Sequence, residues 1–192
     1  MIGAGVAGQG IAYLSALAGY RTILEDILPN ALRKAGDQIR LSLDEALATG
    51  EISSDEAQAA MLRLEYAGSV EDAAREADFV IECVPDELES KLEIFTLLDK
   101  VCRPTTILAS TTSALSVSEI ASVTYRKPKC VGMRFLSSDR ATKLLEIVQA
   151  TETDDETLAA TIEIAKRMRK EILIIRESLE DSLLQQSRTV PQ

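Results

Sequence analysis

The stretch that decides the fold is Met1–Gly10, MIGAGVAGQG, at the start of this 192-residue chain. It contains the pattern G-x-G-x-x-G, formed by Gly3, Gly5 and Gly8. Glycines at this spacing permit a tight turn, close approach of a pyrophosphate to the backbone, and close packing of a helix on a strand. A helical stretch, Val6–Ala18, and a short β-rich run, Thr22–Leu24, follow in that order. The opening residues therefore predict a dinucleotide-binding unit.

An acidic residue follows the second predicted strand. Asp26 lies 18 residues after Gly8. A carboxylate in that place can accept hydrogen bonds from an adenosine ribose, and it would repel a 2′-phosphate. These residues favour NAD over NADP as the cofactor. The alternative interpretation is a helix that packs closely through small residues and binds no ligand.

The strand before the glycine loop is short. Such a loop normally follows a strand of about five residues, whereas only Met1 and Ile2 precede Gly3. In a doubly wound sheet this strand is central, so its loss exposes the edges of the neighbouring strands. Two interpretations stay open: the fold tolerates a two-residue strand here, or the sequence is truncated.

Short apolar runs alternate with longer amphipathic segments along the rest of the chain. The runs are Thr22–Leu24, Phe79–Val84, Thr106–Ala109, Cys130–Met133, Leu144–Val148 and Ile172–Ile175. This alternation predicts one α/β domain, with a doubly wound, mostly parallel sheet and helices on both faces. Three capping boxes are expected at helix starts: Ser53 with Glu56, Ser116 with Glu119, and Thr153 with Glu156.

Two helices are expected between the first two of these runs, Thr22–Leu24 and Phe79–Val84. Apolar residues spaced three or four apart from Leu28 to Leu47 mark one buried helical face. A second helix is expected from Ser54 to about Tyr66. Together they form a helical hairpin over about residues 28–66. We interpret this insertion either as a wall of a substrate site or as an elaborated crossover.

Composition excludes several classes of function. The net charge of −10 and the pI near 4.6 argue against nucleic-acid or anionic-membrane binding through bulk electrostatics. The chain shows no leader and no long apolar run, which predicts a cytoplasmic protein without a membrane span. Its three cysteines form no CxxC pair, so neither a disulfide framework nor a metal site is indicated. The chain contains no histidine, so no imidazole base is available.

From Gly3 to about Ser178 the sequence resembles the NAD-binding domain of the 3-hydroxyacyl-CoA dehydrogenase family. Six segments carry the resemblance: GAGVAGQGIA, TILEDI, ADFVIECVPDELESKLEIF, ILASTTSALSVSEIA, CVGMRF and KLLEIV. The resemblance implies a Rossmann-type domain over residues 1–178, NAD as cofactor, and a role in fatty acid metabolism. The implied reaction is oxidation of a 3-hydroxyacyl-CoA to a 3-ketoacyl-CoA, with an acyl-CoA or hydroxy acid as ligand.

The resemblance also implies roles for individual residues. Asp26 would hold the adenosine ribose, Asp86 and Lys91 would lie near the cofactor, and Ser42 would approach the CoA moiety. Ser113 would touch both the substrate carbonyl and the nicotinamide end.

Several of these positions depart from the family or have simpler interpretations. Asp86 stands in place of the family's usual glutamate, and Thr111 in place of an asparagine. Without the resemblance, Asp86 indicates a helix N-terminus, Lys91 a solvated helical face, and Ser113 a turn or cap residue.

The resemblance breaks at the catalytic dyad. The family's general base is a histidine in a His-Phe-Phe-Asn-Pro stretch, and here Arg134 begins the corresponding RFLSS. Glu146, 12 positions later, stands where the family has the glutamate that orients this base. A guanidinium cannot take a proton near neutral pH, and loss of a positioned base typically lowers the rate by about two to four orders of magnitude. Arg134 could form a salt bridge with Glu146 or stabilise a carbonyl oxygen electrostatically.

Two further departures concern the substrate half. Leu184 stands where the family has an active-site asparagine, and the family's C-terminal helical domain is absent, which leaves residues 179–192 as a short helix or tail. Arg140 and Lys143, near Arg134, form either an anion site or a solvated loop.

Three hypotheses follow for the function. The chain is an NAD-dependent oxidoreductase with weak or altered activity, a non-catalytic NAD(H)-binding pseudoenzyme that serves as a sensor or partner subunit, or one piece of a larger enzyme. Homo-oligomerisation stays open.

Overall fold

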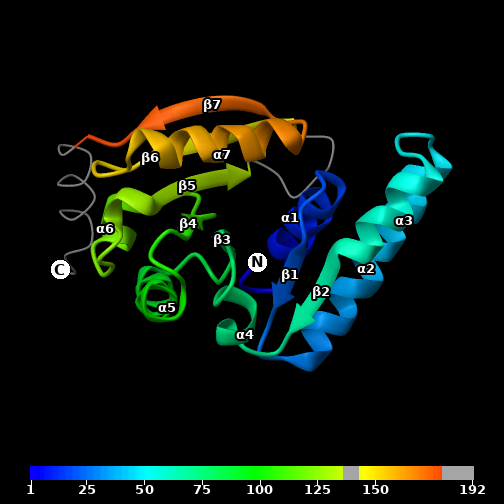
Figure 1. The fold of residues 1–192 in the computed structure, drawn as a ribbon, viewed down its shortest axis with the longest axis horizontal. Helices are drawn as coiled ribbons and strands as arrows, with labels where there is room; N and C mark the ends of the chain where they lie inside the picture. The colour runs from blue at the N-terminus through cyan, green and yellow to red at the C-terminus, as the bar shows by residue number, and fades with distance from the viewer. Residues whose placement is uncertain (136–142, 179–192) are drawn as a thin grey trace, which may run out of the picture.

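Helices and strands alternate along the chain, as the sequence predicts (Figure 1). The computed structural model describes residues 1–135 and 143–178. Its elements are α1 (Val6–Leu17), β1 (Thr22–Glu25), α2 (Pro29–Ala48), α3 (Ser54–Arg63), β2 (Leu64–Ala67), α4 (Val70–Ala74), β3 (Phe79–Glu82), α5 (Leu88–Val101), β4 (Ile107–Ser110), α6 (Val117–Ala121), the 3-10 turn η1 (Lys127–Lys129), β5 (Cys130–Phe135), β6 (Leu144–Gln149), α7 (Asp155–Arg167) and β7 (Glu171–Arg176). Predictions that concern Leu136–Ser138, Arg140, Leu184 and residues 179–192 lie outside the described residues.

One residue joins the two parts of the sheet. β1 pairs with β2, and the other strands form a five-stranded part in the order β3-β4-β5-β6-β7. Ile2 forms parallel bridges to Glu25, at the end of β1, and to Glu82, at the end of β3. Neighbouring strands are parallel except for β5 and β6, which are antiparallel. The doubly wound, mostly parallel sheet is confirmed.

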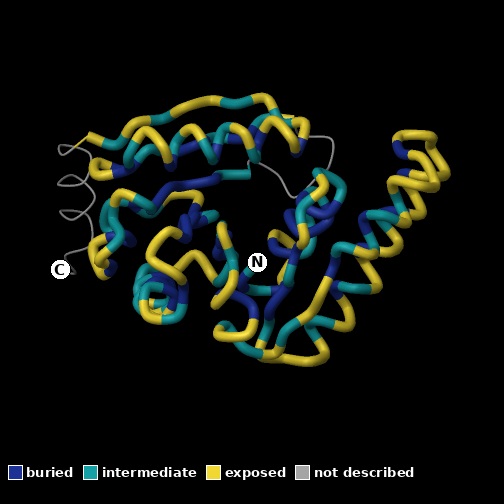
Figure 2. Tube along the Cα trace, in the orientation of Figure 1, coloured by how far each residue is buried: buried dark blue, intermediate teal, exposed yellow. Residues whose placement is uncertain are grey.

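Helices cover both faces because successive residues of a strand point to opposite sides. In β3, Val80 belongs to a buried cluster with Phe95 of α5. The next residue, Ile81, belongs to a different cluster that includes Ile11 of α1 and Ala165 of α7. The middle strands are accordingly buried, whereas the outer turns of α2 and α3 are exposed (Figure 2).

β2 is the strand that the sequence analysis missed. The second helix of the hairpin was expected to run to about Tyr66, but α3 ends at Arg63 and Leu64–Ala67 pairs in parallel with β1. Leu64 is buried, and an ion pair of 2.6 Å joins Arg21 to Glu65. Tertiary pairing with β1 therefore outweighs the local helical pattern.

The hairpin of α2 and α3 packs against α1 (Figure 1). The buried face of α2 consists of small and aliphatic residues at helical spacing: Ala35, Ile39, Leu43 and Ala46. They share a core cluster with Ala12 and Ala16 of α1. The amphipathic pattern thus predicted correctly which face of α2 is buried.

Two of the three expected helix starts are confirmed. Ser53 forms a complete capping box at α3, and the hydroxyl of Ser116 accepts the expected amide hydrogen bond at α6. The third prediction is wrong, because Asp154 rather than Thr153 caps α7. The Thr153 hydroxyl instead donates a buried hydrogen bond of 2.6 Å to the Cys130 carbonyl, which removes it from the helix start.

The glycine loop depends on two glycines for its conformation. Gly3 has φ of +95°, in the left-handed region that favours glycine. A Cβ added at Gly8 would lie 1.8 Å from the Gly3 carbonyl oxygen. A Cβ added at Gly5 would meet no atom within 4 Å. Gly3 and Gly8 are therefore required by the conformation and packing of the protein itself, whereas the space beside Gly5 is open.

We expect Gly8→Ala to lower the free energy of unfolding by about 2 kcal/mol or more, because α1 or the loop must shift to relieve the overlap. Gly5→Ala is the matched control, with an expected loss of less than about 1 kcal/mol, because the extended backbone of Gly5 is open to alanine and an added Cβ meets no atom within 4 Å. Urea denaturation of both variants measures the difference. Equal losses would show that the loop relaxes freely around Gly8.

Candidate functional site

The candidate site lies at the edge of the sheet where the parallel strands end. The glycine loop begins here, directly after Ile2, and Asp26 follows β1. Asp86 lies in the segment after β3, and Ser113 in the segment after β4. Ligands of open α/β sheets bind at the carboxyl ends of the strands. The fold thus brings four of the predicted site positions to one edge.

The glycine loop has the shape that a pyrophosphate requires. Gly5 is the N-cap of α1 and no side chain caps that helix. The first amides of a helix lack partners within the helix and attract anions. Because the space above Gly5 is open, a phosphate oxygen can approach these amides closely. The loop therefore fits a dinucleotide by its packing as well as by its pattern.

The Asp26 carboxylate is oriented by two backbone amides. One oxygen, Oδ2, accepts a hydrogen bond of 3.0 Å from the Ala4 amide, and Oδ1 accepts one of 2.9 Å from the Leu28 amide. Asp26 is half-buried at the side of the glycine loop. A carboxylate held in this way keeps further lone pairs for ribose hydroxyls.

A buried ion pair lies behind the end of β3. Lys91 and Glu82 are 1% and 0% exposed, and the Lys91 Nζ lies 2.8 Å from Glu82 Oε1. Glu82 also accepts hydrogen bonds from the Ser110 hydroxyl at 2.7 Å and from the Val84 amide at 2.7 Å. Burial raises the pKa of Glu82, although the Lys91 ammonium and these donors oppose that effect. The interpretation of Lys91 as a solvated helical residue is wrong.

Sequence reasoning missed Glu82 altogether. The signal was present, because an acidic residue, Glu82, interrupts the apolar run Phe79–Val84 and a lysine follows nine residues later. A carboxylate inside a buried strand needs a cationic or hydrogen-bonding partner. The start of α5 at Leu88 brings Lys91 back over the end of β3 to supply it.

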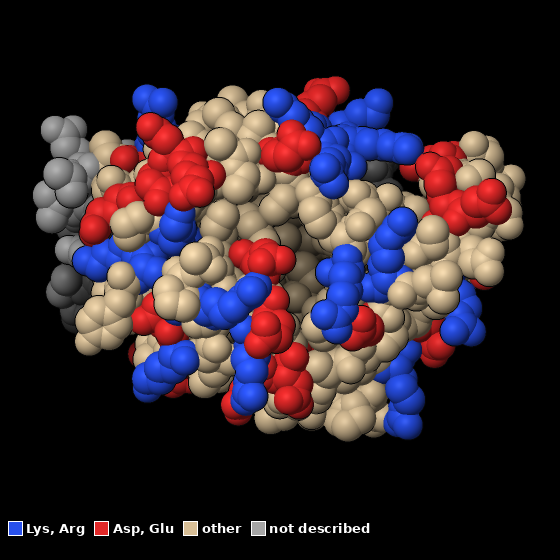
Figure 3. Space-filling view, viewed as in Figure 1, with Lys and Arg blue, Asp and Glu red and all other residues tan. Residues whose placement is uncertain are grey.

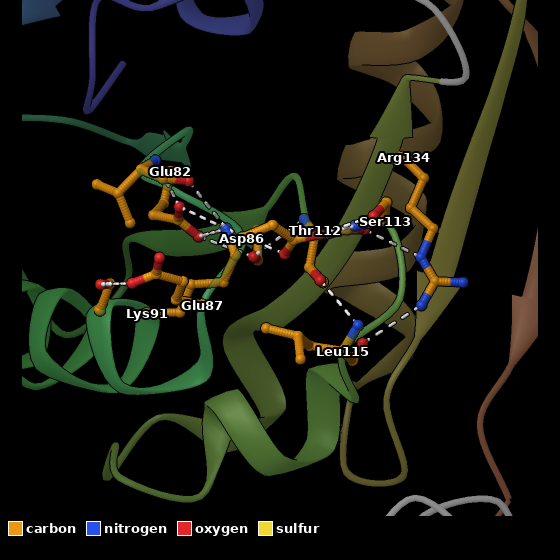
Figure 4. Close-up of polar contacts among 11 residues, drawn as sticks. Glu82, Asp86, Glu87, Lys91, Thr112, Ser113, Leu115 and Arg134 are labelled. Atoms are coloured by element: carbon orange, nitrogen blue, oxygen red, sulfur yellow. Dashed lines mark hydrogen bonds and ion pairs between the residues drawn. The ribbon is translucent and has the colours of Figure 1, made fainter.

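Asp86 connects this ion pair to Ser113 (Figure 4). Its Oδ2 accepts hydrogen bonds from the Ser113 amide at 2.9 Å and from the Ser113 hydroxyl at 2.7 Å. Its Oδ1 lies 3.8 Å from the Lys91 Nζ. Burial acts to raise the pKa of Asp86, but the hydrogen bonds from Ser113 and Thr112 and the Lys91 ammonium outweigh it and hold this pKa below its usual value. Asp86 is therefore an ionised acceptor that fixes the loop after β4.

Arg134 approaches the same loop from β5 (Figure 4). Its Nε donates to the Thr112 carbonyl at 3.1 Å, and its Nη2 donates to the Leu115 carbonyl at 3.4 Å. Glu146 is opposite Arg134 in the antiparallel register of β5 and β6. Within residues 1–135 and 143–178, however, no ion pair joins the two side chains. The expected salt bridge is wrong because the guanidinium turns toward backbone carbonyls.

Ser42 lies apart from this cluster along the chain and in the fold. It is half-buried in the middle of α2, within the hairpin beyond β1. Ser113 follows β4, on the other side of Ile2.

Over the described residues, no group of three or more metal-ligating side chains is arranged to hold an ion, and no helix is long and apolar enough to cross a membrane.

We expect Lys91→Met to lower the free energy of unfolding by about 3 kcal/mol or more, because Glu82 would remain buried without its cation. The double variant Lys91→Met with Glu82→Gln should recover at least half of that loss, since a neutral amide can keep the Ser110 and Val84 hydrogen bonds. Denaturant unfolding of the three proteins forms the measurement. A double variant no more stable than Lys91→Met would contradict the ion-pair explanation.

Comparison with known proteins places this geometry in a family. The family model for the 3-hydroxyacyl-CoA dehydrogenase NAD-binding domain matches residues 1–178. A probable 3-hydroxybutyryl-CoA dehydrogenase of Bacillus subtilis is 34% identical over 168 residues, which are 88% of this chain and 58% of that protein. The 3-hydroxybutyryl-CoA dehydrogenase of Bradyrhizobium diazoefficiens is 30% identical over 174 residues, or 91% of this chain and 59% of that protein. The chain thus spans less than two thirds of these curated relatives.

Solved structures agree with the sequence comparison. The 3-hydroxybutyryl-CoA dehydrogenase of Escherichia coli gives a TM-score of 0.88 at 29% identity, over 92% of this chain and 37% of that chain. The (S)-3-hydroxybutyryl-CoA dehydrogenase of Ralstonia eutropha gives 0.87 at 28% identity, over 92% of this chain and 62% of that chain. The residues that the family model matches, 1–178, include Asp26, Asp86 and Ser113. This chain belongs to the 3-hydroxyacyl-CoA dehydrogenase family, and its residues 1–178 correspond to the NAD-binding domain of that family.

Proposed function

We propose that this chain binds NAD at the glycine-loop edge as the cofactor half of a 3-hydroxyacyl-CoA oxidoreductase, and that its own dehydrogenase activity is weak or lost. One observation carries the proposal: backbone carbonyls engage the guanidinium of Arg134, the residue that the resemblance puts in the place of the family's catalytic histidine. The chain contains no histidine that could replace the base.

The proposed cofactor contacts follow the edge of the sheet. The pyrophosphate would lie over Gly5 and the first amides of α1, and Asp26 would accept the adenosine ribose hydroxyls. The nicotinamide end would lie toward Ser113. Asp86 and Lys91 would act near the cofactor by fixing that loop. When bound, the nicotinamide supplies or accepts the hydride.

The proposed substrate contacts involve Ser113 and Ser42. A 3-hydroxyacyl-CoA or its ketone would place its carbonyl oxygen near the Ser113 hydroxyl, with Ser42 on the hairpin toward the CoA moiety. The names of the similar dehydrogenases support an acyl-CoA ligand. Because the Ser113 hydroxyl donates a hydrogen bond to Asp86, it would have to turn away from Asp86 in order to donate to a substrate oxygen.

Arg134 explains why activity should be low. A guanidinium titrates far above neutral pH, so it cannot remove the proton from a substrate hydroxyl. It can stabilise negative charge on a carbonyl oxygen during reduction. That role would require release from the Thr112 and Leu115 carbonyls. Glu146 keeps the place of the orienting glutamate but has no imidazole to orient.

A second candidate function is a non-catalytic NAD(H)-binding subunit or sensor. The same two carbonyl contacts favour it, because they make Arg134 a clamp on the loop after β4 rather than a group aimed at substrate. In that role the ionic network of Glu82, Lys91 and Asp86 would keep the cofactor edge folded without any chemical step.

We expect Arg134→His to raise the rate of NADH oxidation with acetoacetyl-CoA at least about tenfold over the unaltered chain, since the imidazolium can give the ketone oxygen the proton it needs in this direction, and positioned acid–base catalysis is worth about two to four orders of magnitude. Arg134→Gln is the control, because it removes the clamp without supplying a base. Absorbance of NADH follows the reaction. Turnover by the unaltered chain that Arg134→His does not exceed would contradict the lost-base explanation. Absence of turnover in all three, with NADH bound, would favour the non-catalytic subunit.

Asp26→Ala should weaken NADH binding by about tenfold, because two ribose hydroxyls would lose a charged acceptor worth about 1.5–3 kcal/mol. The nearby acidic control is Asp37→Ala, on the exposed surface of α2. Fluorescence titration with NADH measures both affinities, and circular dichroism checks the fold. An unchanged affinity in Asp26→Ala would show that the ribose lies elsewhere.

A further inference from the structure

Residues 111–116 join β4 to α6 and include Ser113, which the proposed function places at the nicotinamide end of the cofactor. Ser113 is exposed at the cofactor edge of the sheet. Two contacts hold the middle of this segment: Asp86 accepts hydrogen bonds from Ser113, and Arg134 donates to the Leu115 carbonyl (Figure 4). The position of Ser113 also depends on what holds the end of the segment, where α6 begins.

Glu177, directly after β7, holds that end. Its Oε1 accepts a hydrogen bond of 2.7 Å from the Val117 amide, and its Oε2 accepts one of 2.8 Å from the Ser118 amide. Oε2 also accepts hydrogen bonds from the Ser118 hydroxyl at 2.6 Å and from the Ser116 hydroxyl at 3.2 Å. Because the first amides of a helix have no partners within the helix, the Glu177 carboxylate completes the start of α6.

Glu177 is itself fixed by the sheet. Its amide donates to the Gln149 carbonyl at 2.9 Å, which extends the pairing of β6 and β7. Ile175, two residues earlier, packs against the buried cluster that contains Val117. A Cβ added at Gly132 of β5 would lie 2.8 Å from Val117 Cγ2, so the start of α6 is packed closely on β5. The end of β7 and α6 lie on the same side of the molecule (Figure 1).

The connection from this anchor to Ser113 is short. Ser116 lies three residues after Ser113, and three residues span at most about 11 Å when fully extended. The Leu115 amide also donates to the Thr112 hydroxyl at 2.9 Å, which holds the segment in a turn. A shift of the start of α6 would therefore move Ser113 or break its hydrogen bonds to Asp86.

We propose that Glu177 is a positioning residue for Ser113: by anchoring the start of α6, it sets where residues 111–116 lie at the nicotinamide end of the site. The inference rests on the proposed NAD site and gives Glu177 no contact with cofactor or substrate. The proposed ribose and pyrophosphate contacts, at Asp26 and Gly5, lie on the other side of β3. Loss of Glu177 should therefore weaken the nicotinamide end alone.

The test compares NADH with ADP-ribose, which keeps the adenosine ribose and the pyrophosphate but lacks the nicotinamide. Fluorescence titration measures NADH binding and calorimetry measures ADP-ribose binding, on the unaltered full chain and on Glu177→Ala. We expect Glu177→Ala to bind NADH about fivefold more weakly, as expected for one lost hydrogen bond at the nicotinamide end. Its affinity for ADP-ribose should stay within about twofold, because distant sites act independently.

Glu171→Ala is the matched control, since Glu171 is an exposed acidic residue at the other end of β7. Acidic and basic side chains are interspersed over the face shown in Figure 3. The loss of one exposed charge should therefore leave the NADH affinity within about twofold. Glu177→Gln keeps an oxygen acceptor but brings an NH₂ group toward an amide of α6, so its NADH affinity should lie between those of Glu177→Ala and the unaltered chain.

Hydrogen exchange of the free chain reports on the anchor without any cofactor. The Ser113 and Leu115 amides should exchange at least about fivefold faster in Glu177→Ala, because the segment opens locally. The Val84 amide, bonded to Glu82 at 2.7 Å, is the internal reference and should not change. A role in overall stability alone would speed the exchange of all three amides.

Circular dichroism checks that each variant is folded, and Glu177→Gln takes the place of Glu177→Ala if the latter does not fold. Unchanged NADH affinity, equal weakening of NADH and ADP-ribose, or unchanged exchange at Ser113 would overturn the inference. If the unaltered chain binds no NADH, the proposed function itself fails. Faster exchange at Ser113 would then still support the anchoring of this segment by Glu177, and unchanged exchange would refute it.

Discussion

The bonding of Met1, Ile2 and Gly3 to β1 on one side and to the β3 segment on the other is the constraint on which the rest of the structure depends. The Ile2 amide donates to Ile81 and its carbonyl accepts from Cys83 at 2.8 Å, while the adjacent Met1 carbonyl accepts from Glu25 at 2.9 Å. These bonds hold the two-stranded and five-stranded parts of the sheet in one plane. They also fix where the glycine loop leaves the sheet, so the loop, Asp26 and the segment after β3 share one edge. A dinucleotide site at that edge follows from the geometry of this single junction.

The cofactor edge is stabilised by charges that lie behind it. Glu82 and Lys91 are buried and form an ion pair with each other. Asp86, beside Lys91, accepts two hydrogen bonds from Ser113 and so fixes the position of Ser113. Removing either buried partner would leave an uncompensated charge, so the network acts as a unit. Arg134 holds the same loop from the other side. In the proposed function, the part of the site that receives the cofactor is thus preorganised, whereas Arg134 supports the backbone of the loop after β4.

Much of the fold could be predicted from periodicity, but the strand β2 could not. Apolar runs located six of the seven strands found in residues 1–135 and 143–178, whereas Leu64–Ala67 continues a helical pattern and becomes a strand by pairing with β1. At the site, the glycine spacing and Asp26 could be identified locally. The burial of Lys91 depends on how α5 returns over β3. The direction of the Arg134 side chain depends on carbonyls more than 18 residues earlier in the chain, which no local pattern encodes.

The central claim is that the cofactor half of the site is intact although the base is lost. The most direct measurement is a fluorescence titration of the unaltered chain with NADH and, in parallel, with NADPH. We expect saturable binding of one NADH per chain and markedly weaker binding of NADPH, because the Asp26 carboxylate repels a 2′-phosphate. Absence of NADH binding by a folded chain, or equal affinity for the two nucleotides, would contradict the claim that the glycine loop and Asp26 form a working NAD site.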